Sequence, residues 1–354
     1  MTTSSYQHDL RTAFDSIPDA RDLFGTRILV TGATGLICSS VVDLLLLMNR
    51  EFDAGITVYV AGRSEKDAEE RFRRFARNDD ELVFVPYDAT SSEQMDFEGE
   101  LDYIIHGASN ANPAAYAQQP VETMLANLLG LSVMFDLGRA TSARRLLYIS
   151  SSEVYGQKDG LEPFSEGDYG YLDILNERAG YPSSKRAGES LCVAYGMEYG
   201  IESVIVRPGH IYGAAIRPSD NRVSAEVTRR ALAGEDIVLK STGGQLRSYC
   251  YALDCASAIL TVLLRGEKAN AYNISNPHSI CTVRELAEAV AKAGGVEVRF
   301  DLPAGEKILH NLMQNSSLAS DKLEALGWTP AFDLQRGVER MLTALKDPEN
   351  PFSA

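Results

Sequence analysis

The sequence predicts an α/β fold in which a doubly wound parallel sheet carries a smaller C-terminal lobe, and three observations predict it. Short apolar runs rich in Val and Ile alternate with helical patterns from residue 27 to residue 206. The first run ends in a glycine-rich turn that opens a helix. Beyond residue 206 the alternation gives way to a loop-rich stretch. Alternating strands and helices pair as parallel βαβ units, so helices should cover both faces of the sheet.

The same patterns divide the chain into three parts. Residues 1–24 are predicted as a polar lead-in with a short amphipathic helix. Residues 25–206, together with about 248–276, should form the main sheet domain, and residues 207–247 and 277–354 the smaller lobe. A chain of 354 residues is long enough for one large domain or two modest ones, so this division fits its length.

The charge and the cysteine and histidine patterns argue against several kinds of binding site. A net charge of −15 and a pI of about 4.9 disfavour nonspecific binding to nucleic acid or to an anionic membrane. The five cysteines are odd in number and lack Cys-x-x-Cys spacing, so neither a disulfide framework nor a zinc site is indicated. The five histidines have no paired spacing, and we therefore expect no metal.

The sequence also predicts a cytoplasmic protein. Its longest apolar run, residues 41–48, is interrupted by Asp43 and is far too short to span a membrane. The polar N-terminus lacks the pattern of a signal peptide. Reduced thiols in the cytoplasm fit the unpaired cysteines.

A strand, a glycine-rich turn and a helix follow one another near the N-terminus. Residues 27–30 are the predicted strand, residues 31–35 the turn Thr-Gly-Ala-Thr-Gly, and residues 36–48 the helix. Glycines let the backbone approach a pyrophosphate, whose charge is favoured by the amides and the dipole of the helix N-terminus. Cys38 stands where a third glycine is usual, so the fingerprint is incomplete. The stretch predicts a Rossmann-type dinucleotide-binding domain with five cofactor contacts: Gly32, Thr34, Gly35, Leu36 and Ile37.

The end of the next predicted strand bears on the choice of cofactor. An acidic residue there usually binds the ribose 2′-hydroxyl of NAD, but residues 61–64 are Ala-Gly-Arg-Ser. Arg63 could accept the 2′-phosphate of NADP, stack on adenine, or be an ordinary solvated arginine. We expect NAD and leave NADP open because of Arg63. Asp88, which follows the strand at residues 82–85, is a plausible adenine contact.

The chemistry is predicted at Tyr181-Pro-Ser-Ser-Lys185. On a helix these two side chains share a face, because they stand four residues apart. A free phenol has a pKa of about 10, and a neighbouring ammonium group lowers it. Tyr181 is therefore a candidate general base, with Lys185 as its charge partner. The alternative is an ordinary residue of an amphipathic helix, but the position after a dinucleotide-binding start favours catalysis.

A second candidate group follows the predicted strand at residues 145–149. Catalytic groups in open parallel sheets gather beyond the carboxyl ends of strands, and Ser150-Ser-Ser-Glu153 comes directly after this one. Ser151 can hydrogen-bond a reacting oxygen, and Glu153 can move a second proton. The alternative is a plain turn at a strand end. Further along, Arg247 suits a phosphate or a carboxylate, its alternative being a surface salt bridge.

Taken together these motifs resemble the extended short-chain dehydrogenase/reductases, specifically the nucleotide-sugar epimerases, dehydratases and decarboxylases. The resemblance covers nearly the whole chain. It rests on four ordered motifs: residues 31–35, Ser150-Ser-Ser-Glu-Val-Tyr-Gly156, Tyr181 with Lys185, and residues 207–213.

Within that family the chain is most similar to the UDP-glucuronate decarboxylases. Glu153 is typical of dehydratases and decarboxylases rather than of 4-epimerases. The stretch Ala108-Ser-Asn-Ala-Asn-Pro-Ala-Ala-Tyr116 is in register with the decarboxylase pattern A-S-P-A-S-P-P-x-Y. The chain departs from the family at His210, where asparagine is usual, at the two serines before the catalytic lysine, and at the missing ribose acid.

The resemblance implies conversion of UDP-glucuronate to UDP-xylose through a 4-keto sugar, with a catalytic nicotinamide. The alternatives are 4,6-dehydration or 4-epimerisation through the same intermediate and, from a different class, a non-catalytic dinucleotide-binding sensor or scaffold. The catalytic residues it implies are Ser151, Glu153, Tyr181 and Lys185. It adds these cofactor contacts: Ala89, Ala108, Ser109, Asn127, Tyr181, Lys185, Pro208 and His210. The implied substrate contacts are Ser109, Tyr116, Ser152, Glu153, His210, Arg222 and Arg247.

The resemblance also implies a homodimer that forms through the helices at residues 121–140 and 182–199. The first of these carries an apolar stripe, for which packing on the sheet is the alternative. The stripe consists of Met124, Leu128, Leu131, Met134 and Phe135.

Overall fold

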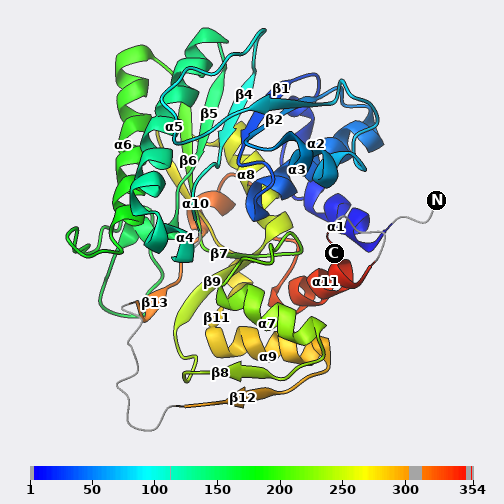
Figure 1. Ribbon diagram of the computed structural model, residues 1–354, viewed down its shortest axis with the longest axis vertical. Helices are drawn as coiled ribbons and strands as arrows, with labels where there is room; N and C mark the ends of the chain where they lie inside the picture. The colour runs from blue at the N-terminus through cyan, green and yellow to red at the C-terminus, as the bar shows by residue number, and fades with distance from the viewer. Residues whose placement is uncertain (1–3, 112, 303–312, 348–351, 353–354) are drawn as a thin grey trace.

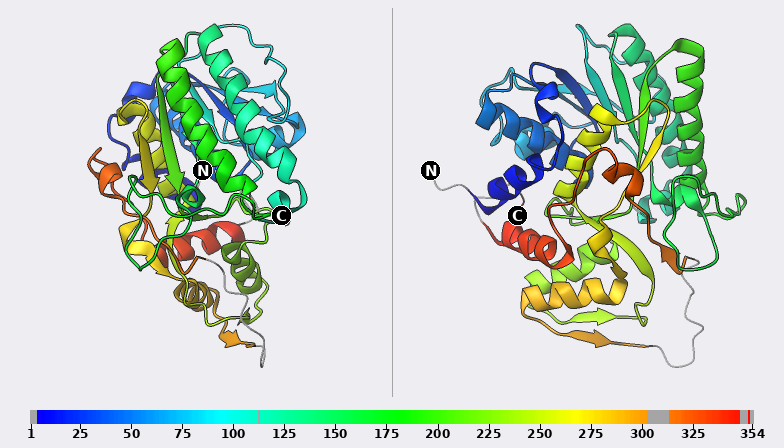
Figure 2. Two further views of the ribbon diagram at one scale, coloured as in Figure 1. Left: turned by 90° about the vertical axis from the view of Figure 1, so that its left-hand side faces the viewer. Right: turned by 180° about the vertical axis from the view of Figure 1, so that it is seen from behind.

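The computed structural model describes residues 4–111, 113–302, 313–347 and 352. A large sheet flanked by helices occupies one end of the molecule, and a smaller lobe lies beyond one end of its strands (Figure 1). The carboxyl ends of the strands drawn in green and yellow point toward that lobe (Figure 2). Side chains that follow the strands therefore face the junction between the two parts.

The large sheet has seven parallel strands in the order β10-β6-β5-β4-β1-β2-β3. The strand order reverses at β1, beside β4, which is the position where doubly wound sheets bind ligands. The predicted fold class is thus confirmed. The strands are β1 Arg27–Thr31, β2 Thr57–Gly62, β3 Leu82–Pro86, β4 Tyr103–His106, β5 Arg145–Ile149, β6 Ser203–Pro208 and β10 Ala271–Ile274.

Helices cover both faces of this sheet because successive strand residues point to opposite sides. On one side Leu147 and its neighbours pack with α2 and α8, whereas on the other side Leu146 and its neighbours pack with α5 and α6 (Figure 1). The covering helices are α2 Leu36–Phe52, α3 Glu65–Phe72, α5 Pro120–Ala140, α6 Gly180–Tyr199 and α8 Ala252–Arg265.

The apolar stripe of α5 is divided between the sheet and the surface. Leu131, Met134 and Phe135 are fully buried against the sheet, whereas Met124 is 37% exposed. Length and apolar composition alone would let α5 cross a membrane, but 56% of its most apolar window is buried inside this structure. Packing of a core helix accounts for that composition.

The N-terminal helix α1 (Ser5–Phe14) packs on α2 and explains why a charged residue is tolerated in the apolar run. Asp43 is fully buried there, accepts a 2.7 Å hydrogen bond from the Tyr6 hydroxyl and pairs with Arg71. A buried carboxylate needs such partners.

The smaller lobe holds a four-stranded sheet in which β9 pairs with β7, β11 and β13, and a two-stranded sheet of β8 and β12. Its strands are β7 His210–Tyr212, β8 Ile237–Leu239, β9 Leu246–Tyr251, β11 Ile280–Thr282, β12 Val298–Phe300 and β13 Asn315–Ser316. Its helices are α7 Val223–Leu232, α9 Val283–Gly294 and α11 Leu334–Lys346, whereas α10 Asp321–Glu324 contacts β10 of the large sheet. The remaining short elements are α4 Pro113–Gln118 and the 3-10 turns η1 Ala20–Leu23, η2 Ser152–Tyr155 and η3 Pro277–Ser279.

Candidate active site

Tyr181 and Lys185 lie one above the other in the first turns of α6, both buried beneath the ends of β5 and β6. The Lys185 Nζ donates a 2.8 Å hydrogen bond to the carbonyl of Ile149 and lies 5.9 Å from the centre of the Tyr181 ring. Burial lowers the pKa of Lys185 to about 7. Burial therefore brings the titration of this amine toward neutral pH.

The phenol of Tyr181 is strongly influenced by its neighbours. Burial and the charge of Glu153 raise its pKa, whereas a hydrogen bond from Ser151 and the charge of Arg222 lower it. Tyr181, Ser151 and Lys185 are thus brought together as the sequence pattern requires. Because the raised pKa keeps the phenol neutral, additional positive charge is needed before Tyr181 can act as a base at neutral pH.

Glu153 lies on the turn η2, and its backbone amide donates a 3.2 Å hydrogen bond to the Ser151 hydroxyl. The hydroxyl of Tyr116 donates to Glu153 Oε1 at 3.4 Å, and the Tyr116 ring stacks on Tyr181 with centroids 5.1 Å apart. Burial raises the pKa of Glu153. A carboxyl group that holds its proton more tightly than usual can act as a general acid.

Arg178 is a site residue that the sequence analysis missed. It lies in the loop before α6, and its guanidinium lowers the pKa of both Tyr116 and Glu153 against the effect of burial. The one sequence signal for Arg178 was its position three residues before Tyr181, which places it next to the start of the helix that carries Tyr181 and Lys185. The charge of Arg178 makes this side of the site suitable for an anionic group.

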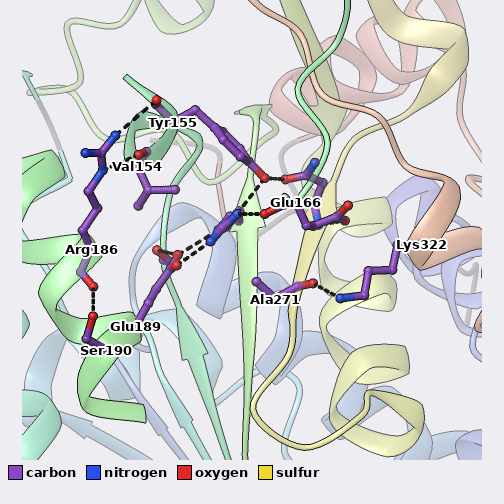
Figure 3. A network of polar contacts seen from close by, with 11 residues as sticks. Val154, Tyr155, Glu166, Arg186, Glu189, Ser190, Ala271 and Lys322 are labelled. Carbon is purple, nitrogen blue, oxygen red and sulfur yellow. Dashed lines mark hydrogen bonds and ion pairs between the residues drawn. The ribbon is translucent and has the colours of Figure 1, made fainter. Parts of the chain in front are cut away.

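Arg186 fixes the backbone of the turn that carries Glu153 (Figure 3). Its Nε donates to the carbonyl of Val154 at 2.6 Å, and its Nη2 donates to the carbonyls of Tyr155 and Gly170. A Cβ on Gly170 would lie 2.2 Å from the Gln157 carbonyl, so only glycine allows the loop to fold back here. The turn is therefore held by α6 itself.

A buried ion pair supports the same turn from beneath. Arg207, whose side chain is 2% exposed, donates to both carboxylate oxygens of Glu189 at 2.9 and 2.6 Å. Arg207 also donates to the Tyr155 hydroxyl at 3.0 Å, and Glu189 accepts a 2.6 Å bond from Ser150 (Figure 3 shows Glu189 and Tyr155). Ser150 and Tyr155 flank Ser151 and Glu153 in the chain, and both are therefore hydrogen-bonded to this ion pair.

The predicted cofactor turn has the close backbone approach that a pyrophosphate requires. Gly32 has φ +65°, and a Cβ there would lie 2.9 Å from the backbone of Gly107. Gly35 is the N-cap of α2 and supplies no side-chain cap, so the first amides of the helix, including those of Leu36 and Ile37, have no capping side chain. These features fit the pyrophosphate of a dinucleotide.

Cys38 is accommodated by a compensating glycine. A Cβ on Gly107 would lie 2.4 Å from the Cys38 sulfur, so the larger residue in the usual glycine position is matched by a missing side chain on the neighbouring strand end. The Ala108 amide donates to Thr31 Oγ1 at 3.1 Å and closes the same turn. The departure at Cys38 therefore leaves the turn intact.

The other predicted cofactor contacts surround this turn. Hydrogen bonds from the Thr90 amide and hydroxyl lower the pKa of Asp88, and the charge of exposed Arg63 lowers it further. Asn127 donates to Ser184 at 3.0 Å, while its Oδ1 and the Ser109 hydroxyl are buried without a partner among the described residues. Two further contacts, Ala89 and Pro208, lie beside the ends of β3 and β6.

The predicted substrate residues of the smaller lobe lie near one another. His210 opens β7 with its Nδ1 buried and unpartnered in the described structure, and burial together with the charges of Arg247 and Arg222 lowers its pKa to about 3. Its ring packs edge-on against Tyr249 at 5.7 Å. His210 is therefore neutral at physiological pH.

The two arginines beside His210 differ in their partners. Arg222 pairs with Asp220 at 2.5 Å, so its charge is already compensated. Arg247 is 5% exposed and donates only to the carbonyls of Leu246 and Met313 among the described residues. The alternative of a surface salt bridge is wrong for Arg247, which is a buried cation. Ser152, on the turn η2, is also buried.

No group of three or more His, Cys, Asp or Glu side chains within the described ranges is arranged to hold a metal ion. All five cysteines are buried and free.

Comparison with known proteins agrees with this geometry. A UDP-glucuronic acid decarboxylase of Arabidopsis thaliana is 31% identical over 315 residues, covering 89% of this chain and 87% of the relative. One from Xenopus tropicalis is 28% identical, covering 89% and 71%. The solved Thermus thermophilus UDP-glucose 4-epimerase in complex with NAD superposes with a TM-score of 0.70 at 25% identity, covering 89% and 97%. The model of the NAD dependent epimerase/dehydratase family matches residues 28–275, and the chain belongs to that family.

Proposed function

We propose that the protein is a nucleotide-sugar decarboxylase that converts UDP-glucuronate to UDP-xylose with NAD as a catalytic cofactor. The observation that carries the proposal is the grouping of Glu153, Tyr116 and Arg178 beside Tyr181. A sugar that bears a carboxylate needs a cation where its carboxylate lies, and Arg178 supplies one. A 4-epimerase needs neither that cation nor a carboxyl group such as Glu153.

The side chains of this chain have distinct tasks in the reaction. NAD, held by the glycine-rich turn at Gly32 and Gly35, would supply reversible hydride transfer at C4 of the sugar. Tyr181 takes the proton of the C4 hydroxyl, and the Ser151 hydroxyl binds the same oxygen. The resulting ketone is β to the carboxylate, so the C5–C6 bond can break, releasing CO₂ and leaving its electron pair in an enolate. Tyr181 and Ser151 stabilise that enolate oxygen by donating hydrogen bonds.

Glu153 then protonates C5, which its raised pKa favours. Arg247, with neutral His210 beside it, binds the diphosphate, because a buried guanidinium whose partners among the described residues are carbonyls gains most from an anion. Arg222 contributes less, since Asp220 already neutralises it.

We further propose a cytoplasmic homodimer that forms through α5 and α6. Apolar side chains remain exposed on both helices, including Val121 at 63%, Leu125 at 39% and Met197 at 83%. Burying them against a second copy would remove this apolar surface from water. The free, buried cysteines support the compartment.

The proposal is tested by incubating the protein and NAD⁺ with UDP-glucuronate labelled with ¹³C at C6. We expect release of ¹³CO₂ together with a UDP-pentose in the mass spectrum. Turnover should fall by a factor of at least about 100 in Tyr181→Phe. Protein that binds NAD⁺ but releases no CO₂ would refute decarboxylation. Elimination of water from a neutral nucleotide hexose would then identify a 4,6-dehydratase, a second candidate favoured by Glu153, which can also serve in elimination across C5 and C6.

A further inference from the structure

Arg217 links the smaller lobe to the glycine-rich turn of the sheet domain. It lies in the loop between β7 and α7, and its Nη2 donates to the carbonyl of Thr34 at 3.1 Å and to the Thr34 hydroxyl at 2.7 Å. These two residues are 183 positions apart in the chain. The contact therefore places a guanidinium from one part of the molecule on the turn that opens α2 in the other part.

The charge of Arg217 has no compensation from the protein within the described ranges. It pairs there with no carboxylate, whereas Arg222 in the same loop is neutralised by Asp220. Its position is also electrostatically unfavourable, because Thr34 precedes the N-terminus of α2 and a helix N-terminus carries partial positive charge. A cation held at the positive end of a helix is stabilised when an anion binds between them.

The pyrophosphate of the dinucleotide is an anion that fits this place. The turn around Gly32 allows close backbone approach, and the first amides of α2 lack a side-chain cap. Arg217 is exposed, so its fork of donors can turn from Thr34 to phosphate oxygens.

We propose that Arg217 binds the pyrophosphate of the dinucleotide cofactor from the side of the smaller lobe and retains the cofactor on the enzyme. Retention suits a reaction in which the cofactor ends each turnover unchanged. The inference rests on membership of the NAD-dependent family, and it holds whichever nucleotide sugar is the substrate.

The diphosphate of the nucleotide sugar has the same chemistry and is the other source of an anion. The two sources are separated by measuring the affinities for NAD⁺ and for UDP independently, by calorimetry on full-length protein freed of cofactor. The variants are Arg217→Ala and Arg217→Lys. The matched control is Arg50→Ala, which removes an exposed arginine at the opposite end of the same helix.

We expect Arg217→Ala to weaken NAD⁺ binding about tenfold or more, since a charge-assisted contact to phosphate is lost. Arg217→Lys should lie between the alanine variant and the wild type, because lysine keeps the charge and loses the fork. The affinity for UDP should not change, and the NAD⁺ affinity of Arg217→Ala should depend less steeply on salt.

Equal NAD⁺ affinities in Arg217→Ala and Arg50→Ala would overturn the proposal. Weaker binding of UDP with unchanged NAD⁺ binding would also overturn it and would assign Arg217 to the nucleotide sugar. If the wild type bound no NAD⁺ at all, the cofactor assignment of the proposed function would fail together with this inference. NAD⁺ binding that is sensitive to Arg217 but without CO₂ release would leave the inference standing and remove only the decarboxylase proposal.

Discussion

The buried pair between Glu189 and Arg207 should contribute more to stability than any exposed ion pair of the molecule. In Glu189→Gln the shape of the side chain is kept and its charge is lost. Arg207, at 2% exposure, then faces a neutral amide. Breaking a buried pair by removing one partner destabilises proteins by about 3–5 kcal/mol. Because the Glu189 carboxylate also accepts the Ser150 hydroxyl, we expect the free energy of unfolding to fall by at least about 3 kcal/mol.

A double-mutant cycle separates the pair from its surroundings. Glu189→Gln, Arg207→Met and the double variant are unfolded in urea and followed by circular dichroism. The double variant should lose clearly less stability than the two single losses combined, because it leaves no uncompensated buried charge. The matched control is the exposed pair of Arg284 and Glu288, 2.7 Å apart, for which Glu288→Gln should change stability by about 1 kcal/mol or less.

Two results would refute this reasoning about Glu189 and Arg207. One is a loss in Glu189→Gln no larger than that in the exposed control. The other is strict additivity in the double variant, which would mean that the two charges are stabilised independently. Activity gives a second readout: since Ser150 and Tyr155 flank the turn of Glu153, the single variants that still fold should show a lower kcat with little change in KM.

Three further predictions concern single side chains. Arg178→Gln should raise KM for a carboxylated nucleotide sugar and leave NAD⁺ affinity unchanged. Because Arg178 lowers the pKa of Glu153, its loss should move the part of the kcat–pH profile that Glu153 governs to higher pH. Arg63→Ala should weaken NADP⁺ binding more than NAD⁺ binding, and equal effects in titrations would remove Arg63 from cofactor choice. Burial raises the pKa of Asp254 to about 7, whereas an aspartate in the unfolded chain has a pKa of about 3.9. Between these values the folded state holds a proton that the unfolded state has released, so the free energy of unfolding should fall as pH rises from about 4 to 7. Asp254→Asn should flatten that slope in urea unfolding at pH 5 and pH 7.5.

The sequence predicted the parallel sheet well because strands buried on both faces form continuous apolar runs. The runs at residues 27–30, 82–85 and 145–149 became β1, β3 and β5 within one residue at each end. Residues 318–320, directly before the short helix α10, are not helical. The backbone amides of Leu318 and Ala319 are instead used in bonds to Ser248 and to the Phe164 carbonyl, and no local pattern reveals such distant partners.

The candidate site divides in the same way between local and distant signals. Tyr181 and Lys185 could be found because helical spacing alone puts them on one face. Arg217 could not be found, because its importance comes from a contact with Thr34, and the place of Arg178 near Tyr181 does not show that its charge acts on Glu153. Charged loop residues are common in any sequence, so a pattern search cannot separate these arginines from solvated ones.

Cys38 illustrates how a departure from a motif can be misjudged without its spatial partner. A residue larger than glycine at the start of α2 should push the helix away from the strand ends and weaken pyrophosphate binding. The sulfur instead occupies the space that a side chain at residue 107 would fill, since a Cβ there would lie only 2.4 Å away. Residues 38 and 107 therefore act as a pair that conserves volume, and Gly107→Ala alone should displace the turn, whereas adding Cys38→Gly should relieve the clash. The meaning of a motif position thus depends on the strand that packs against it.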